Sequence, residues 1–272
     1  MSRPKAAIDW EAVSFRFVFT ALTVLAVIVL VTPTAIVLLT SFTASESLRF
    51  PPAGLSLRWY YALLDADQMQ RAAWNSLIVA LWTTLVCVVF GTAAALGIAR
   101  TRSMWVRGLD LLFMSPLLLP ALAFGFAALV YINRLGFSPS LEFLVIGHVI
   151  VCVPYVLRTT IASLTQLDPA LFDASESLGA SWPMTFRKVT LPLIAPGLIA
   201  GAFLAFMASF DNVPVSLFLA DARTEMLPIH LWQQIDTNLD VRTAAASGLI
   251  VIFTLALMLI AERVAGLTGQ MR

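Results

Sequence analysis

The tetrapeptide Ser209-Phe210-Asp211-Asn212 places a single carboxylate at the end of a long apolar run. A charged group within or near a membrane helix is costly and usually has a function, and a carboxylate there suits the passage of a cationic solute. Opposite charges about 4 Å apart attract each other by roughly 4 kcal/mol at an effective dielectric constant near 20. Asp211 could equally cap its helix or bridge to the next loop at the membrane surface. Residues 209–212 are therefore candidates for a translocation pathway, and the sequence leaves both roles open.

Other polar residues in the apolar runs give weaker signals. Asn75 and Ser76 lie near the start of an apolar segment and are secondary candidates for the same pathway. His148 is expected to be an interior residue with satisfied hydrogen bonds rather than a ligand. Cys87 and Cys152 both fall in apolar runs, so we expect small buried side chains and no disulfide, redox or metal chemistry. No catalytic residue, cofactor or metal is expected.

The segment 164–190 carries the signals of two short helices between apolar runs. Asp168-Pro169 is typical of a helix start, because an acidic N-cap precedes a proline at the first helical position. Gly179 is a natural C-terminal stop, and Ser181-Trp182-Pro183 indicates a second short helix. One face of the first helix is small and mildly apolar, with members at helical spacing: Leu171, Ala174, Ser175 and Leu178. Such a face fits a groove on a partner.

The elements that must position these residues are membrane-spanning helices. Of the 272 residues 60% are hydrophobic and 12% are charged, whereas soluble domains have about 45–50% and about 25%. Lipid offers no hydrogen-bond partner to an open strand edge, and the alternating segments of a barrel are not seen, so the spans must be helical. Six spans are expected near 16–42, 73–99, 109–131, 143–163, 191–213 and 243–261. The predicted fold class is all-α and integral to the membrane, with one transmembrane domain over 1–272.

Both chain ends are expected on the cytoplasmic side. The run 17–42 has no charged residue, and as a helix it would be about 39 Å long, which is too long for a signal peptide. With the N-terminus inside, eleven of the 17 Lys and Arg residues fall on the cytoplasmic side and six fall outside. That is the direction which the positive-inside rule favours. The net charge of +1 does not indicate a nucleic-acid partner.

The segment 173–192 resembles the cytoplasmic loop of permeases in binding-protein-dependent ATP-binding-cassette importers. Their motif is Glu-Ala-Ala, three residues, Gly, then about nine residues to Ile-x-Leu-Pro. The matching positions here are Asp173-Ala174-Ser175, Gly179 and Val189-Thr190-Leu191-Pro192. Asp replaces Glu, Ser replaces the second Ala and Val replaces Ile, and each change is conservative in size or charge. The resemblance implies a coupling helix that sits in a cleft of an ATPase subunit, made by Asp173, Ala174, Ser175, Leu178 and Gly179, with Leu191-Pro192 re-entering the membrane.

Most of the chain resembles the spermidine/putrescine-type branch of these importers. The likeness rests on the six spans, the loop before the penultimate one, the outer segment 50–60 and Ser209-Phe210-Asp211. It implies a type I importer permease fold in the bacterial inner (plasma) membrane, without enzymatic activity, that carries a polyamine-like or other cationic or zwitterionic solute. Related subunits serve aminophosphonates, opines and ferric iron, so the sequence does not identify the solute.

The resemblance also implies the partners. The chain contains no Gly-x-x-x-x-Gly-Lys-Ser/Thr run that would bind ATP, so two separate ATPase subunits are expected. A homologous second permease, in a heterodimer rather than a homodimer, and an extracytoplasmic solute-binding protein complete the assembly in the lipid bilayer. Arg223, Glu225, Asp236 and Asp240 lie in an expected outer loop that could contact the binding protein, although a solvated loop is the simpler interpretation.

Two other functions would also fit a protein with many spans. A stand-alone secondary transporter or channel would predict intramembrane ion pairs and more spans, and it would leave the 164–190 loop unexplained. An intramembrane enzyme would need paired aspartates, a His-Glu-x-x-His site or a Ser/His pair inside the spans. None of these is recognisable in the sequence.

Overall fold

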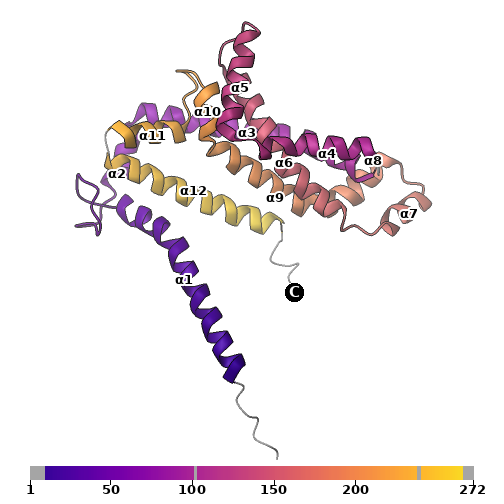
Figure 1. Ribbon diagram of the computed structural model, residues 1–272, viewed down its shortest axis with the longest axis horizontal. Coiled ribbons are helices and arrows are strands. Elements are labelled where there is room, and N and C mark those ends of the chain that lie inside the picture. Colours follow the sequence, from indigo (N-terminus) through magenta and orange to yellow (C-terminus); the bar gives the residue numbers. More distant parts are fainter. Residues whose placement is uncertain (1–9, 101–102, 238–239, 266–272) are drawn as a thin grey trace, which may run out of the picture. The chain divides into compact units, whose positions relative to one another are not determined.

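The computed structural model describes residues 10–100, 103–237 and 240–265 (Figure 1). Apart from an isolated bridge between Thr43 and Leu55, the regular structure in these ranges is helical. In chain order the elements are α1 (Trp10–Ser41), α2 (Arg58–Ala62), the 3₁₀ turn η1 (Leu63–Asp65), α3 (Asp67–Arg100), α4 (Met104–Leu118), α5 (Ala121–Arg134), α6 (Leu141–Leu164), α7 (Ala170–Ser177), α8 (Trp182–Thr185), the π-helical turn η2 (Phe186–Thr190), α9 (Leu191–Phe210), α10 (Val213–Leu219), α11 (Leu227–Thr237) and α12 (Val241–Ala265).

Among the described residues, five helical stretches are long and apolar enough to cross a membrane. They are Phe15–Ser41, Asp67–Ala99, Leu141–Leu164, Trp182–Phe210 and Val241–Ala265. The bent pair α4 and α5 makes a sixth span when it is counted as one. The prediction of an all-α membrane fold with about six spans is therefore confirmed.

The region predicted as the third span, 109–131, forms two helices instead of one. The axes of α4 and α5 are bent by 103° at the break between Leu118 and Ala121. Pro120 has no amide hydrogen, and its ring disfavours a helical conformation at the residue before it. Leu119 is accordingly extended, with ψ of 142°. A proline in this span breaks the helix rather than bending it.

The chain forms two compact units. The first contains α1, α2 and the beginning of α12. Residues 15–34 of α1 are exposed within the chain. An apolar helix with no buried face in its own chain is suited to lipid or to another subunit. At the end of α1, Ser41 Oγ lies 2.7 Å from Tyr60 Oη, and after it Trp59 donates from Nε1 to the carbonyl of Ser45.

The second unit is organised around α3, α6 and α9, which pack side by side (Figure 1). Small residues permit this packing, because Gly91 of α3 and Gly201 of α9 both lie against Val156 of α6. Cys87 and Cys152 are buried in this packing, as predicted, and both are free thiols.

The short helix α10 packs against α5 and α6. A side chain at Gly125 of α5 would collide with the carbonyl oxygen of Pro214, and one at Gly147 of α6 would lie 2.5 Å from the Leu219 side chain. The two glycines therefore leave room for α10. The predicted fifth span extended to residue 213, but α9 ends at Phe210 and α10 follows as a separate helix.

Candidate functional site

The helix α7 is formed by the local signals that the sequence contains. The carboxylate of Asp168 accepts a hydrogen bond of 2.9 Å from the Ala170 amide at the start of α7. At the other end Gly179 has φ of +75°, a left-handed conformation that glycine adopts without steric cost. Its amide donates to the carbonyl of Glu176, and the Ala180 amide donates to that of Ser175. The predicted start and stop of this helix are confirmed.

A hydroxyl pair holds α7 against α8. Ser175 Oγ lies 2.7 Å from Thr185 Oγ1, and Ser175 is the one residue of α7 that is buried. The rings of Trp182 and Phe186 stack with centroids 5.6 Å apart, which links α8 to η2. In η2 the Leu191 amide donates to the carbonyl of Phe186, five residues earlier. The chain thus continues without a break from α8 into the membrane helix α9.

The outward surface of α7 and of the turn after it carries small and apolar residues beside exposed carboxylates. Ala174 and Gly179 are exposed, and Leu178 is 87% exposed, so these side chains have little contact with the rest of the chain. Asp173 is exposed beside them, whereas Leu191 is half-buried and Pro192 is exposed at the start of α9. The predicted coupling residues therefore divide into an outward face and the inward-facing Ser175.

Behind α7 lies a cavity of about 300 Å³. It is lined by Phe172 of α7 together with residues from three other elements: Leu96, Ala99, Leu164 and Thr190. Phe172 is half-buried and lines this cavity together with the ends of α3 and α6. The two sides of α7 therefore differ, since one faces the cavity and the other is exposed.

At the opposite end of α9 the predicted pathway residues have separate structural contacts. Ser209 Oγ lies 2.8 Å from Nδ1 of His148, and Nε2 of the same ring lies 3.0 Å from Ser216 Oγ. All three side chains are fully buried. The neutral ring can donate from one nitrogen and accept at the other, so both serines are satisfied. The prediction that His148 is a satisfied interior residue is confirmed.

This contact is also a Ser/His pair inside the spans, which the sequence did not reveal because 61 residues separate the two positions. Both ring nitrogens are engaged by serines, and neither hydroxyl is accessible from solvent. The arrangement fixes α10 to α6 and α9, and it offers no exposed nucleophile.

The other three residues of the tetrapeptide differ in their freedom. Phe210 stacks on Phe206 and contacts Phe253. Asn212 caps α10, since its side-chain oxygen accepts from the Val215 amide at 3.0 Å. Asp211 is exposed, and within the described part of the chain its carboxylate has no hydrogen-bond or ionic partner. Asp211 is therefore the member of the group whose side chain is free.

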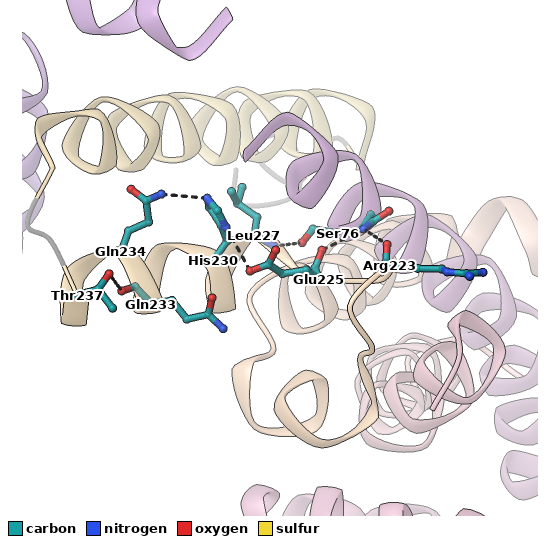
Figure 2. A network of polar contacts seen from close by, with 9 residues as sticks. Ser76, Arg223, Glu225, Leu227, His230, Gln233, Gln234 and Thr237 are labelled. Atoms are coloured by element: carbon teal, nitrogen blue, oxygen red, sulfur yellow. Dashed lines mark hydrogen bonds and ion pairs between the residues drawn. The ribbon is translucent and has the colours of Figure 1, made fainter. Parts of the chain in front are cut away.

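A polar network holds the loop between α10 and α11 (Figure 2). Asn75 Nδ2 donates to the carbonyls of Arg223 and Glu225, at 3.0 and 3.1 Å. The Leu227 amide donates to Ser76 Oγ at 2.8 Å. The two polar residues at the start of α3, considered above as pathway candidates, thus serve to position this loop.

Two residues of α11 complete the network. His230 Nδ1 lies 3.2 Å from a carboxylate oxygen of Glu225, and its Nε2 lies 3.3 Å from Nε2 of Gln234 (Figure 2). His230 is buried. Neither His230 nor Gln234 was singled out from the sequence, and only the four-residue spacing on an amphipathic helix would have suggested that they act together.

Within the same loop Asp221 forms a tight turn. Its Oδ1 accepts from the amides of Arg223 and Thr224 and from the Thr224 hydroxyl. The Thr224 hydroxyl is the main reason that the pKa of Asp221 lies below its ordinary value, because hydrogen bonds favour the charged carboxylate.

Two further charges of the expected spans pair with each other. Arg158 Nη2 lies 3.3 Å from Asp110 Oδ2, which links α6 to α4. Arg158 lies in the C-terminal half of α6, where it is half-exposed, and Asp110 lies in the N-terminal half of α4.

Among the described residues, no three His, Cys, Asp or Glu side chains are arranged to hold a metal ion.

Comparison with known proteins identifies consistent relatives. Residues 88–268 match a family described as binding-protein-dependent transport system inner membrane component. The spermidine/putrescine transport system permease protein PotC of Haemophilus influenzae is 27% identical over 209 residues, which cover 77% of this chain and 81% of that protein. The molybdenum transport system permease protein ModB of Mycobacterium bovis is 31% identical over 219 residues, or 75% and 83% of the two chains.

A solved structure has the same fold. It is a chain of a bacterial alginate ABC transporter in complex with an alginate pentasaccharide-bound periplasmic protein. The TM-score is 0.71 at 14% sequence identity, with 94% of this chain and 96% of that chain covered.

Proposed function

The chain belongs to the family of binding-protein-dependent transport system inner membrane components, and we propose that a separate ATPase drives it by docking on α7. It is a permease of an ATP-binding-cassette importer and a multi-pass protein of the bacterial inner membrane. In the proposed assembly it forms half of the translocation pathway beside a second, homologous permease. Two ATPase subunits face the cytoplasm, and an extracytoplasmic solute-binding protein delivers the solute.

The observation that carries the coupling proposal is the shape of α7 and its attachment. Its outward face, formed by Asp173 and Ala174 together with Leu178 and Gly179 of the following turn, is exposed, as a helix that inserts into a groove requires. Its inward side is bonded through Ser175 to α8, which continues into α9. A displacement of α7 by a bound ATPase would therefore reach a membrane helix directly.

The charge at the other end of α9 supports a cationic solute. Residues 211–237 contain four carboxylates and one arginine. Such an excess of negative charge attracts cations and repels anions. This negative charge makes the spermidine/putrescine permease a better guide to the solute than the molybdenum permease. A polyamine-like compound is the proposed substrate class, and an aminophosphonate, an opine or ferric iron are the alternatives.

Substitution at Gly179 tests the coupling assignment. Gly179→Ala and Gly179→Arg share the strain of a side chain at positive φ, about 1–2 kcal/mol, and differ only in bulk and charge. We expect Gly179→Arg and Asp173→Lys to insert into the membrane but to lose co-purification with the ATPase, while Gly179→Ala and the loop control Gln166→Lys retain it. Normal assembly of the Gly179→Arg and Asp173→Lys variants would disprove docking on α7.

Substitution at Asp211 tests the pathway assignment. In proteoliposomes that contain the complete transporter, Asp211→Asn should lower the uptake of putrescine more than that of a neutral polar solute, because the ionic attraction is lost. The control is Asp65→Asn, an exposed carboxylate remote in sequence from α9. Equal putrescine uptake by the parent and Asp211→Asn would remove Asp211 from the pathway.

The same assay on the parent transporter tests the substrate class. Uptake of molybdate in place of putrescine would overturn the proposed substrate class.

A further inference from the structure

A groove of about 310 Å³ lies between α10 and α11. Val213 and Leu217, one turn apart on α10, line one side. The helix α11 contributes the rest: Ile229, Trp232, Gln233, Asp236 and Thr237. The α11 positions follow the spacing i, i+3, i+4, i+7 and i+8, so they form one continuous face of the helix.

The neighbouring face of α11 is committed to the polar network. His230 and Gln234 lie on that face, where His230 bonds both to Gln234 and to Glu225 (Figure 2). Gln233 and Thr237 line the groove instead. The Leu227 amide is held by Ser76 at the start of the helix. Because these contacts fix the helix, the groove is a preformed surface.

The side chains of the groove combine three kinds of contact. Val213, Leu217 and Ile229 offer an apolar surface. Trp232 is 63% exposed, so its side chain is accessible to a ligand. Asp236 lies one turn further along the same face, is exposed, and has no cationic partner among the described residues.

This combination selects one ligand chemistry. An aromatic face attracts an ammonium group, and a carboxylate one helical turn away supplies the opposite charge. The apolar wall accommodates methylene groups that a small inorganic cation would not possess. An anion would be repelled by Asp236, and a purely apolar ligand would desolvate that carboxylate without compensation.

We propose that the groove between α10 and α11 binds a primary alkylammonium group, with Trp232 and Asp236 as its main contacts. The proposal rests on the function proposed above and adds to it a first contact site for the solute in the segment that follows Asp211. An ethanolamine lipid carries the same ammonium chemistry. The occupant that we infer is the free solute, and the lipid is the alternative that the experiment separates.

The test uses the complete transporter labelled with 5-fluorotryptophan in nanodiscs of phosphatidylglycerol, a lipid without an amine. The Trp232 signal is assigned by its loss in Trp232→Phe. Titration with 1,4-diaminobutane should shift this signal saturably, whereas 1,4-butanediol, which has the same carbon chain without charge, should not. Asp236→Asn should weaken the apparent affinity by about 5- to 10-fold, and Asp65→Asn should leave it unchanged.

A second arm repeats the titration in phosphatidylethanolamine nanodiscs. An equal shift in both lipids supports a site for the free solute. A Trp232 signal already shifted by the ethanolamine lipid, with no further response to the diamine, would show a lipid site and overturn the proposal. No shift in either lipid, or equal affinity of the parent and Asp236→Asn, would also overturn it.

Uptake and ATPase association measured on the same preparations separate the two proposals. Loss of the groove signal with intact association and putrescine uptake would remove only the groove. Failure of the parent to bind any ATPase would remove the function on which the groove proposal rests.

Discussion

The segment that precedes α9 and the segment that follows it are held in different ways. Before α9, the decisive contacts are local, such as the bond of Asp168 to the Ala170 amide two residues away and the Ser175–Thr185 pair ten residues apart. After α9, the contacts bridge long distances in the sequence. His148 reaches Ser216 across 68 residues, and the loop before α11 is held from the start of α3 across about 150 residues.

This difference matches the roles proposed for the two segments. A helix held by its own neighbours can be displaced as a body by a partner, because few contacts with the bundle must break. A segment bonded to both α3 and α6 keeps its position and can present a fixed surface to a solute.

The largest effect is expected at His148, the residue that joins the α10 segment to the bundle. His148→Leu leaves the hydroxyls of Ser209 and Ser216 without their partner in a buried site, which costs about 1–3 kcal/mol for each. The free thiols Cys87 and Cys152 are buried, so their reaction with a fluorescent maleimide during heating reports unfolding.

A triple variant provides the control for His148. Combining His148→Leu with Ser209→Ala and Ser216→Ala removes both sides of each hydrogen bond, and it should recover part of the lost stability. If His148→Leu alone unfolds at the temperature of the parent, then the buried pair does not hold α10.

The second effect concerns the space for α10. Gly147→Val would place methyl groups against Leu219, and such overpacking costs about 1–3 kcal/mol. The matched control is Gly97→Ala in α3, where nothing lies within 4 Å of an added Cβ and alanine favours the helix. The thiol assay should show lower stability for the first variant and no loss for the second. Equal stability would mean that α10 is not packed on α6.

A smaller effect is expected at Ser175 before α9. Ser175→Ala removes one hydroxyl and restores the family motif, and the net worth of such a bond is about 0.5–1.5 kcal/mol. Thr185 retains a bond of 3.3 Å to the carbonyl of Ser181. The ATPase should still co-purify with this variant. Loss of assembly would show that the Ser175–Thr185 pair is needed to present α7.

The smallest effect is a pH response of the Asp221 turn. The pKa of Asp221 in the folded protein lies below its ordinary value of 3.8, so the charged carboxylate stabilises the turn above pH 3.8. This contribution is lost as the pH falls through the lowered pKa. A spin label on Ala222→Cys, an exposed position, should become more mobile at low pH. With Asp221→Asn the mobility should not depend on pH, and a persistent response would assign the titration to another group.

Much of the segment before α9 could be predicted because its information is local. Asp168-Pro169 marked the start of α7, Gly179 marked its end, and the apolar runs marked the spans, since hydropathy and capping act within one or two turns. The break at Pro120 shows the limit of this reasoning. A proline in an apolar run is compatible with a bend or with a break, and the packing of the neighbouring helices decides between them.

Hydropathy and local signals are enough to identify a helical membrane protein, the segments that are apolar enough to span a bilayer, and the place of a family motif before α9. Packing of the helices is what brings Ser209 to His148, lets Asn75 and Ser76 hold a distant loop, and leaves the carboxylates of Asp211 and Asp236 without partners among the described residues. The physical reason is the range of the interactions. Hydropathy and helix capping depend on neighbouring residues, whereas a buried hydrogen bond between distant residues exists only after the helices have packed.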